Sequence, residues 1–233
     1  ASPGDKLLIG SGTYEEEVEI DANGLTLVGC GAGKSNPGRP RIIPPTPEVT
    51  GRGIQSIGFD DLTFQSLDFE NQNSDHIFVA QSTNLTFRDI TGNGMENTRY
   101  AVFPVLSNNV LVELCDVERQ DDAPIYVGQS SGIVVRHNRV RNGVAGIEIE
   151  NSGSAQVYGN VGLNNTAGIL VFKDGSLAVQ LAQCHAVHHN VFDNNNTPNF
   201  GSGTVAGVPT GSGILVIDLG SGEVVSRVEL GVK

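Results

Sequence analysis

Short alternations of apolar and polar residues recur along the chain at a nearly constant spacing. Ala101, Ala123, Ala145 and Ala167 follow one another at an interval of 22 residues, and the last three are followed by PIYV, GIEI and GILV. A fixed period of this length, carried by alternation of period two, is typical of a solenoid in which each coil packs on the next. The pattern therefore predicts stacked coils of β-strands.

In this register, two strands of each coil place apolar side chains in the interior. The inward columns of the first strand are expected to be Phe103, Ile125, Ile147, Ile169 and Ile214, and beside them Val105, Val127, Ile149, Val171 and Val216. The second strand ends on a ladder that runs through Leu67, Ile90, Cys115, Asn138, Asn160 and Asn190. Asparagine suits such a turn because its amide can bond both its own backbone and the amide of the next coil, so these residues are expected to be structural.

Length and composition favour one all-β domain. The chain has 233 residues, 30 glycines and no tryptophan, which suits many tight turns and short strands, and about eight coils are expected. We divide the domain into an N-terminal coil and loop (1–52), regular coils (53–172), a loop-bearing coil (173–212) and a C-terminal coil (213–233). No apolar run is long enough to span a membrane.

The net charge and the positions of the histidines argue against nucleic-acid and metal binding. A formal net charge of −12 disfavours nucleic acids, whose binding normally needs a basic patch. His185, His188 and His189 are close in sequence, but alternation places His188 and His189 on opposite faces of a strand, and no cysteine or carboxylate completes a ligand spacing. No metal or other cofactor is therefore predicted.

Several segments are similar to a known family. The opening SPGDKLLIGSGTYEEEVEI, and the stretch from Ala101 to Phe200 with IYVGQSSGIVVRHN, AGIEIENS, GILVF and NNNTPNF, resemble right-handed parallel β-helix proteins of the pectin-lyase-like superfamily. More narrowly, the second stretch is similar to a family of exported bacterial β-helix repeat proteins of unestablished activity. The resemblance implies an extracellular or periplasmic protein. The superfamily includes polysaccharide lyases, hydrolases and epimerases beside binding and structural proteins, and the fold alone does not choose among them.

Two insertions mark the best candidate for a functional surface. About eight extra residues lie within 173–185 and about fifteen within 197–211, and insertions of this kind project from solenoids as loops. Beside them, alternation points a set of first-strand residues outward, and two further residues open the first insertion. The predicted ligand-binding strip is Tyr126, Leu170, Phe172, Lys173 and Asp174, with Glu148 and Glu150 among them.

Three functions fit this surface. The first is a non-catalytic module that binds a carbohydrate or protein partner along the strip and the loops of 173–212. The second is a polysaccharide-active enzyme in which Glu148 and Glu150, about 6.6 Å apart along the strand, act as acid and base. The third is a structural rod whose uncapped ends contact one another or another domain.

One further motif is considered and set aside. Arg119-Gln120-Asp121-Asp122 is similar to the paired aspartates of polygalacturonases. The glycine-flanked histidine and the later arginine–lysine motif of that family are missing. Polygalacturonase activity is therefore not predicted.

Overall fold

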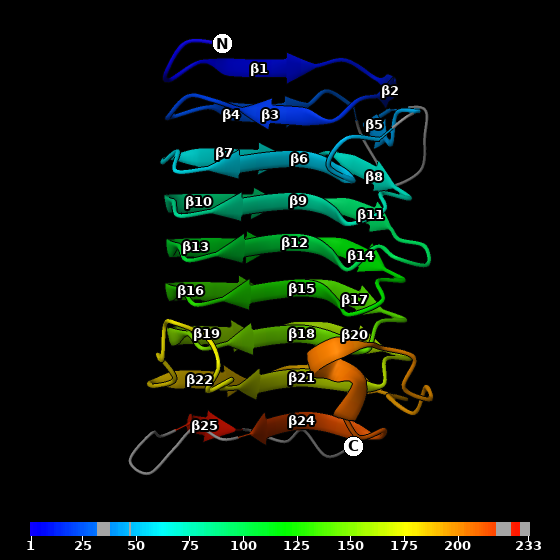
Figure 1. The fold of residues 1–233 in the computed structure, drawn as a ribbon, viewed down its shortest axis with the longest axis vertical. Helices are drawn as coiled ribbons and strands as arrows, with labels where there is room; N and C mark the ends of the chain where they lie inside the picture. The colour runs from blue at the N-terminus through cyan, green and yellow to red at the C-terminus, as the bar shows by residue number, and fades with distance from the viewer. Residues whose placement is uncertain (32–37, 47, 218–224, 229–233) are drawn as a thin grey trace.

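The computed structural model describes residues 1–31, 38–46 and 48–217, together with the backbone of 225–228. The chain is a right-handed parallel β-helix whose coils are stacked along the long axis (Figure 1). The described strands form three parallel sheets of nine, eight and eight strands. The predicted fold class is confirmed, and the C-terminal coil predicted for 213–233 lies partly outside the described residues.

Each coil contributes one strand to each sheet. Sheet A contains β1 (Lys6–Ile9), β4 (Thr26–Gly29), β7 (Leu62–Gln65), β10 (Thr83–Arg88), β13 (Asn108–Glu113), β16 (Ser131–Arg136), β19 (Gly153–Tyr158), β22 (His185–His188) and β25 (Val225–Val228). Sheet B contains β2 (Gly12–Glu15), β5 (Pro40–Ile43), β8 (Asp68–Glu70), β11 (Thr91–Asn93), β14 (Asp116–Glu118), β17 (Arg139–Arg141), β20 (Val161–Leu163) and β23 (Val191–Asp193). Sheet C contains β3 (Val18–Ile20), β6 (Arg52–Ile57), β9 (Asp75–Ala80), β12 (Tyr100–Val105), β15 (Ala123–Gly128), β18 (Ala145–Glu150), β21 (Ala167–Phe172) and β24 (Ser212–Ile217). A single turn of 3₁₀ helix, η1 (Gly203–Gly207), precedes β24.

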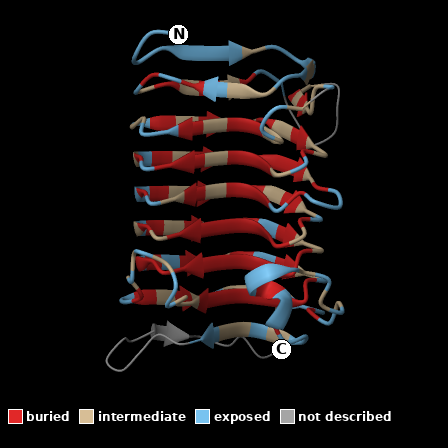
Figure 2. Ribbon diagram, in the orientation of Figure 1, coloured by how far each residue is buried: buried red, intermediate tan, exposed pale blue. Residues whose placement is uncertain are grey.

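The core runs through the centre of the coils. Ile125, Ile147, Ile169 and Ile214 are stacked in register on successive strands of sheet C, as predicted. In sheet A, Phe64 stacks on Phe87 with ring centroids 5.4 Å apart. Figure 2 shows buried residues along β9, β12, β15, β18 and β21.

The predicted register is wrong in one coil. Val102, not Phe103, lies opposite Ile125, and Val105 lies opposite Gly128, so Phe103 and Val105 face outward and are half-buried. The turn between β14 and β15 holds four residues (119–122), whereas the turn between β17 and β18 holds three (142–144). The extra residue shifts the pairing by one place, and in a β-strand a shift of one place exchanges the two faces.

Side-chain ladders connect the coils at their corners. Asn138 Nδ2 donates to Asn160 Oδ1 (3.0 Å), and Asn160 Nδ2 donates to Asn190 Oδ1 (2.9 Å), which confirms the predicted asparagine ladder. Two further ladders were not predicted. One is formed by Ser82, Ser107, Ser130 and Ser152, in which the backbone N–H of each of the first three donates to the hydroxyl of the next, and the other joins Asn165 to Asn195.

Candidate functional site

The predicted strip on sheet C is present but covered. Tyr126, Glu148 and Leu170 lie side by side on β15, β18 and β21 and point outward from the helix interior, as alternation predicts. Their exposed fractions are only 5%, 1% and 2%. The expectation that the strip is exposed is therefore wrong.

The cover is the second predicted insertion. Residues 197–211, here called the covering loop, contain η1 and fold back over the outer face of sheet C, where Figure 1 shows η1 in orange in front of β18 and β21. Val205 and Val208 of this loop are buried in one cluster with Tyr100, Tyr126 and Leu170. The strip is consequently a second, smaller core between the sheet and the loop.

Under the covering loop, Glu148 meets Asp122 from the turn that precedes β15. The two carboxyl groups lie within hydrogen-bonding reach of each other. Asp122 Oδ1 and Glu148 Oε2 have no other hydrogen-bond partner. Two carboxyl groups can bond in this way only when one of them carries a proton.

Burial determines the charge of this pair. Burial is the largest cause that raises the pKa of Glu148 well above its usual range, and the neighbouring Asp122 and Glu150 raise it further. Burial also raises the pKa of Asp122, although hydrogen bonds from Glu148 and Tyr100 oppose the rise. Because two buried charges of the same sign repel each other, Glu148 is the group of the pair that takes up a proton more readily than an ordinary carboxyl group.

Two buried tyrosines complete the cluster. Tyr100 Oη donates to Asp122 Oδ2 (3.0 Å) and accepts from Arg99 Nη2 (3.0 Å), while Tyr126 Oη donates to Glu150 Oε2. Burial raises the pKa of both phenols, so they remain donors. Burial also raises the pKa of Glu150, and the bond from Tyr126 lowers it in part. Glu148 therefore has Asp122 as its hydrogen-bonded partner, and Glu150 has Tyr126.

The remaining predicted strip residues lie at the end of β21. Phe172 is half-buried and packs against the cluster under the covering loop. Lys173 and Asp174 are half-buried in the first insertion. Asn151 holds that insertion in place, because its Nδ2 donates to the carbonyls of Asp174 (2.9 Å) and Val179 (2.7 Å). A ligand-binding role for these residues stays a prediction.

Two hollows open beside the buried pair and meet at Asp121. The first is a polar cleft of about 370 Å³ lined by Asn73, Asn97, Arg99, Asp121, Asp122 and, from the covering loop, Ser202, Gly203 and Thr204. The second, of about 390 Å³, is bounded in part by Met95, Arg119, Asp121 and Phe200. Phe200 is 49% exposed, so its ring offers an apolar surface to a ligand in the second hollow. Asp122 thus belongs both to the buried pair and to the wall of the cleft.

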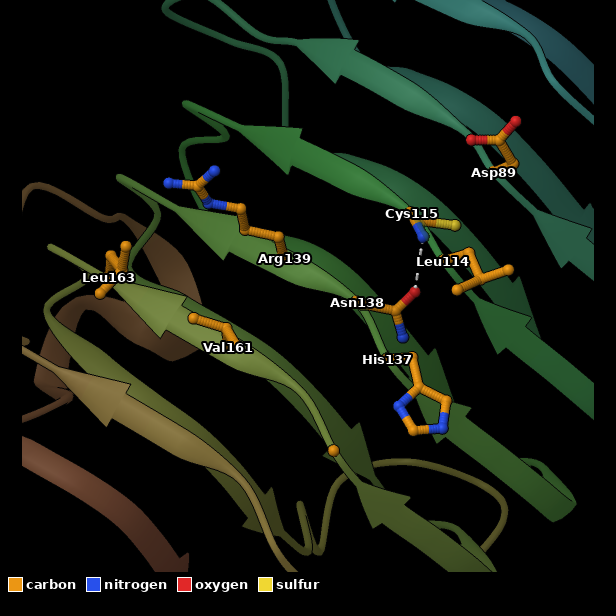
Figure 3. Close-up of a pocket in the computed structure, with 9 residues that line it drawn as sticks. Asp89, Leu114, Cys115, His137, Asn138, Arg139, Val161 and Leu163 are labelled. Carbon is orange, nitrogen blue, oxygen red and sulfur yellow. Dashed lines mark hydrogen bonds between the residues drawn. The ribbon is translucent and has the colours of Figure 1, made fainter. Parts of the chain in front are cut away.

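A larger hollow lies elsewhere, at the corner between sheets A and B (Figure 3). It has a volume of about 640 Å³ and is lined by residues that include Leu114, Cys115, His137, Asn138 and Arg139. The bond drawn there, from Cys115 N to Asn138 Oδ1 (2.9 Å), belongs to the structural ladder. Because this hollow lacks a buried carboxyl pair, we regard the cleft beside Asp122 as the candidate functional site.

The histidines differ from the prediction. His188 Nδ1 and His189 Nδ1 lie 2.7 Å apart, so the two rings do not point to opposite faces. The reason is that His189 lies in a turn with a φ of 52°, where strand alternation no longer applies. Within the described ranges, no group of three or more His, Cys, Asp or Glu side chains is placed to hold a metal ion.

Sequence reasoning missed Asp122. Its motif, Arg119 to Asp122, was noticed, but the comparison with polygalacturonases gave it no role. A length comparison of successive turns would have singled it out, since the turn that carries it is one residue longer than the next turn between sheets B and C.

No described helix is long and apolar enough to cross a membrane.

Three parallel sheets with inward apolar columns define a β-solenoid, and comparison with known proteins agrees. The family model for the right handed beta helix region matches residues 48–184, which is more than half of the chain. The chain belongs to this family. A search of curated proteins found no match.

Solved structures with a similar fold include a phage tailspike domain, an alginate epimerase and a DFA-IIIase. The enzymatically active domain of tailspike protein 2 of bacteriophage CBA120 is 12% identical with a TM-score of 0.43, over 92% of this chain and 41% of that one. The periplasmic alginate epimerase AlgG is 13% identical with a TM-score of 0.43, over 88% of this chain and 60% of that one. A DFA-IIIase from Arthrobacter chlorophenolicus is 13% identical with a TM-score of 0.37, over 93% of this chain and 83% of that one. The chain spans less than two thirds of the first two proteins, and at such identities the likeness concerns the fold alone.

Proposed function

We propose that this protein binds a carbohydrate in the two hollows that meet at Asp121. The observation that carries the proposal is the continuity of a polar cleft, lined by Asn97 and Arg99, with an exposed aromatic ring, Phe200. Sugar hydroxyls bond to planar amide, guanidinium and carboxylate groups, while the C–H faces of a sugar ring pack on an aromatic side chain. Each hollow is near the lower end of the range for small-molecule sites, about 300–1,000 Å³.

The charge of the site favours a neutral glycan. Asp121 and Asp122 line the cleft together with Arg99, and the whole chain carries a net charge of −12. Uronate or sulfated polymers would be repelled by this field. An extracellular or periplasmic location, where such glycans are found, is part of the proposal.

Binding to a panel of neutral and acidic glycans tests the proposal. Arg99→Ala is expected to weaken binding to a retained glycan about tenfold or more, because a hydrogen bond to a charged group contributes roughly 1.5–3 kcal/mol and 1.4 kcal/mol is a factor of ten. Phe200→Ala is also expected to weaken binding, because it removes the aromatic face on which the sugar ring packs. Arg139→Ala, an exposed arginine in the hollow of Figure 3, is the matched control and should leave affinity unchanged. Equal affinities for all three variants and the unmodified protein would contradict the site.

A second candidate function, glycoside hydrolysis, is favoured by the buried carboxyl pair of Asp122 and Glu148, in which the pKa of Glu148 is raised well above its usual range. A protonated carboxyl group in the wall of a ligand cleft can act as general acid toward a glycosidic oxygen. This assignment replaces Glu150 with Asp122 as the partner of Glu148.

Product analysis on the same panel separates hydrolysis from binding alone. If the protein is a hydrolase, new reducing ends appear, and Asp122→Asn and Glu148→Gln each reduce turnover at least a hundredfold, in line with the usual contribution of general acid catalysis. Binding by these variants should change only a few-fold. Turnover that survives both substitutions would discard the assignment.

A further inference from the structure

The covering loop leaves and returns to the helix at one place. At its start, Thr197 N donates to Asn165 O (3.3 Å), and at its end Gly211 N donates to Thr166 O (3.0 Å). Asn165 is itself fixed by the ladder bond to Asn195 (3.2 Å). The loop is thus an Ω-loop, because its two ends are hydrogen-bonded to the adjacent residues Asn165 and Thr166.

The covering loop maintains its own shape. Asn199 Nδ2 donates to the carbonyls of Val205 (2.9 Å) and Val208 (2.9 Å), and Gly201 N donates to Asn199 Oδ1 (2.8 Å). These bonds hold the two buried valines in a fixed relation to the start of the loop. The loop can therefore move as one body without losing them.

Its hold on the sheet is apolar. Val205 and Val208 are the loop residues buried against sheet C. In the part of the chain that the structure describes, no hydrogen bond joins residues 199–210 to the outer face of that sheet. Glu148 lies between Tyr126 and Leu170 of this cluster and is 1% exposed, so a carboxyl group is buried in the same row. Burial of carboxyl groups opposes the closed arrangement, whereas burial of the valines favours it.

We propose that the covering loop turns about its anchor at Asn165 and Thr166 and uncovers an extension of the ligand cleft formed by Tyr126, Glu148 and Leu170. The loop supplies one wall of the cleft through Ser202, Gly203 and Thr204, so its displacement joins the cleft to the covered row. The extension would take further units of the same glycan along sheet C. This inference rests on the proposed function for the nature of the ligand, whereas the motion is measured without any ligand.

Thiol reactivity measures the motion directly. Cys30 and Cys184 are exposed and are first replaced by serine, while the buried Cys115 is kept. Leu170→Cys then places a thiol under the covering loop, and Ile169→Cys places one on the preceding residue, which faces the core and is 0% exposed. Under native conditions, the Leu170→Cys thiol is expected to react with Ellman's reagent at least ten times faster than the Ile169→Cys thiol. Adding Val205→Ala should raise the first rate about tenfold, because it removes two buried methyl groups from the closed state, and leave the second unchanged.

Equal and slow reaction of both thiols, with and without Val205→Ala, would overturn the motion. Thermal melting checks that each variant is folded. If the Leu170→Cys variant is not folded, Tyr126→Cys gives the same readout two strands away. In the glycan panel, Val205→Ala should also tighten binding, since less free energy is spent on opening. Faster thiol reaction without tighter binding would overturn the covered extension. Fast thiol reaction in a protein that retains no glycan would confirm the motion and contradict the carbohydrate proposal.

Discussion

Glu148 shows how one side chain's surroundings set its chemistry. An ionised carboxylate loses much of its hydration when buried, so a buried carboxyl group takes up a proton unless a cation or several donors compensate. Asp122, Glu150 and Arg99 act on Glu148, and Arg99, the cation among them, is exposed and hydrogen-bonded to Tyr100. The Asp122–Glu148 pair is therefore accommodated better with one proton and one negative charge than with two negative charges.

The raised pKa of Glu148 predicts how stability depends on pH. The folded protein holds the proton more tightly than the unfolded chain, whose value is near 4.5, so stability from this group is fully present below that value and is lost as pH rises through the folded pKa. Glu148→Gln imitates the protonated form and should remove this loss. We expect the variant to have a higher free energy of unfolding than the unmodified protein at pH 8, by about 1.4 kcal/mol for each unit of pKa shift, and a similar one at pH 4.

Urea unfolding at pH 4, 6 and 8 measures this difference. Asp174→Asn is the control. Hydrogen bonds from Ser176 lower the pKa of Asp174, so its pKa shift has the opposite sign to that of Glu148. That carboxylate is partly exposed, so little change is expected. Equal destabilisation by Glu148→Gln at all three pH values would contradict the raised pKa of Glu148.

Alternation along the chain predicts which way a side chain points but not whether it meets water. Tyr126, Glu148 and Leu170 point outward as predicted, because period two is a local property of a strand. Their burial depends on Val205 and Val208, which lie far along the chain and carry no periodic signal. For the same reason, Asp122 was not recognised as the partner of Glu148.

Among the elements, turn length governs register. The interior of sheet A follows the prediction from β7 to β22, since each strand there carries its own apolar alternation. In sheet C, the 22-residue spacing predicts that Ala101 pairs with Ala123. Because the turn at 119–122 holds four residues, Tyr100 pairs with Ala123 instead. The same longer turn carries Asp121 and Asp122 into the cleft. A departure from the regular repeat thus coincides with the candidate site.

The asparagine ladder makes a testable contribution to the stability of the coils. Asn160 donates to Val135 O (3.0 Å) and to Asn190 Oδ1 (2.9 Å), and its own Oδ1 accepts from Asn138 N (3.0 Å). Asn160→Ala leaves these buried groups without partners, and each unsatisfied group costs about 1–3 kcal/mol. We expect a loss of roughly 3 kcal/mol or more in the free energy of unfolding.

Asn164→Ala is the matched control for the ladder. Asn164 is also stacked on the next coil, through Asn194 Nδ2 (2.6 Å), but it is exposed and its positive φ of 57° is the main demand on the residue. A loss of about 1 kcal/mol is expected from the less favourable backbone conformation alone. Equal losses for the two variants in denaturant unfolding would show that burial of the ladder contributes nothing.

For the whole molecule, the solenoid separates surfaces with different chemistry. The hollow at the corner of sheets A and B is the larger one, and ladder and turn residues form much of its lining. The hollows that meet at Asp121 lie where the covering loop folds back on sheet C. Membership of the right-handed β-helix family gives the scaffold, and the polar cleft that continues to the exposed Phe200 ring at the second location carries the functional proposal.

The central claim is that a carbohydrate occupies the hollows beside Asp121. The most direct measurement is a crystal structure of the protein soaked with a glycan that it retains in the binding panel. The account predicts electron density for sugar between Phe200 and Arg99, in contact with Asp121. Sugar density confined to the hollow of Figure 3, beside Leu114 and Arg139, would contradict it.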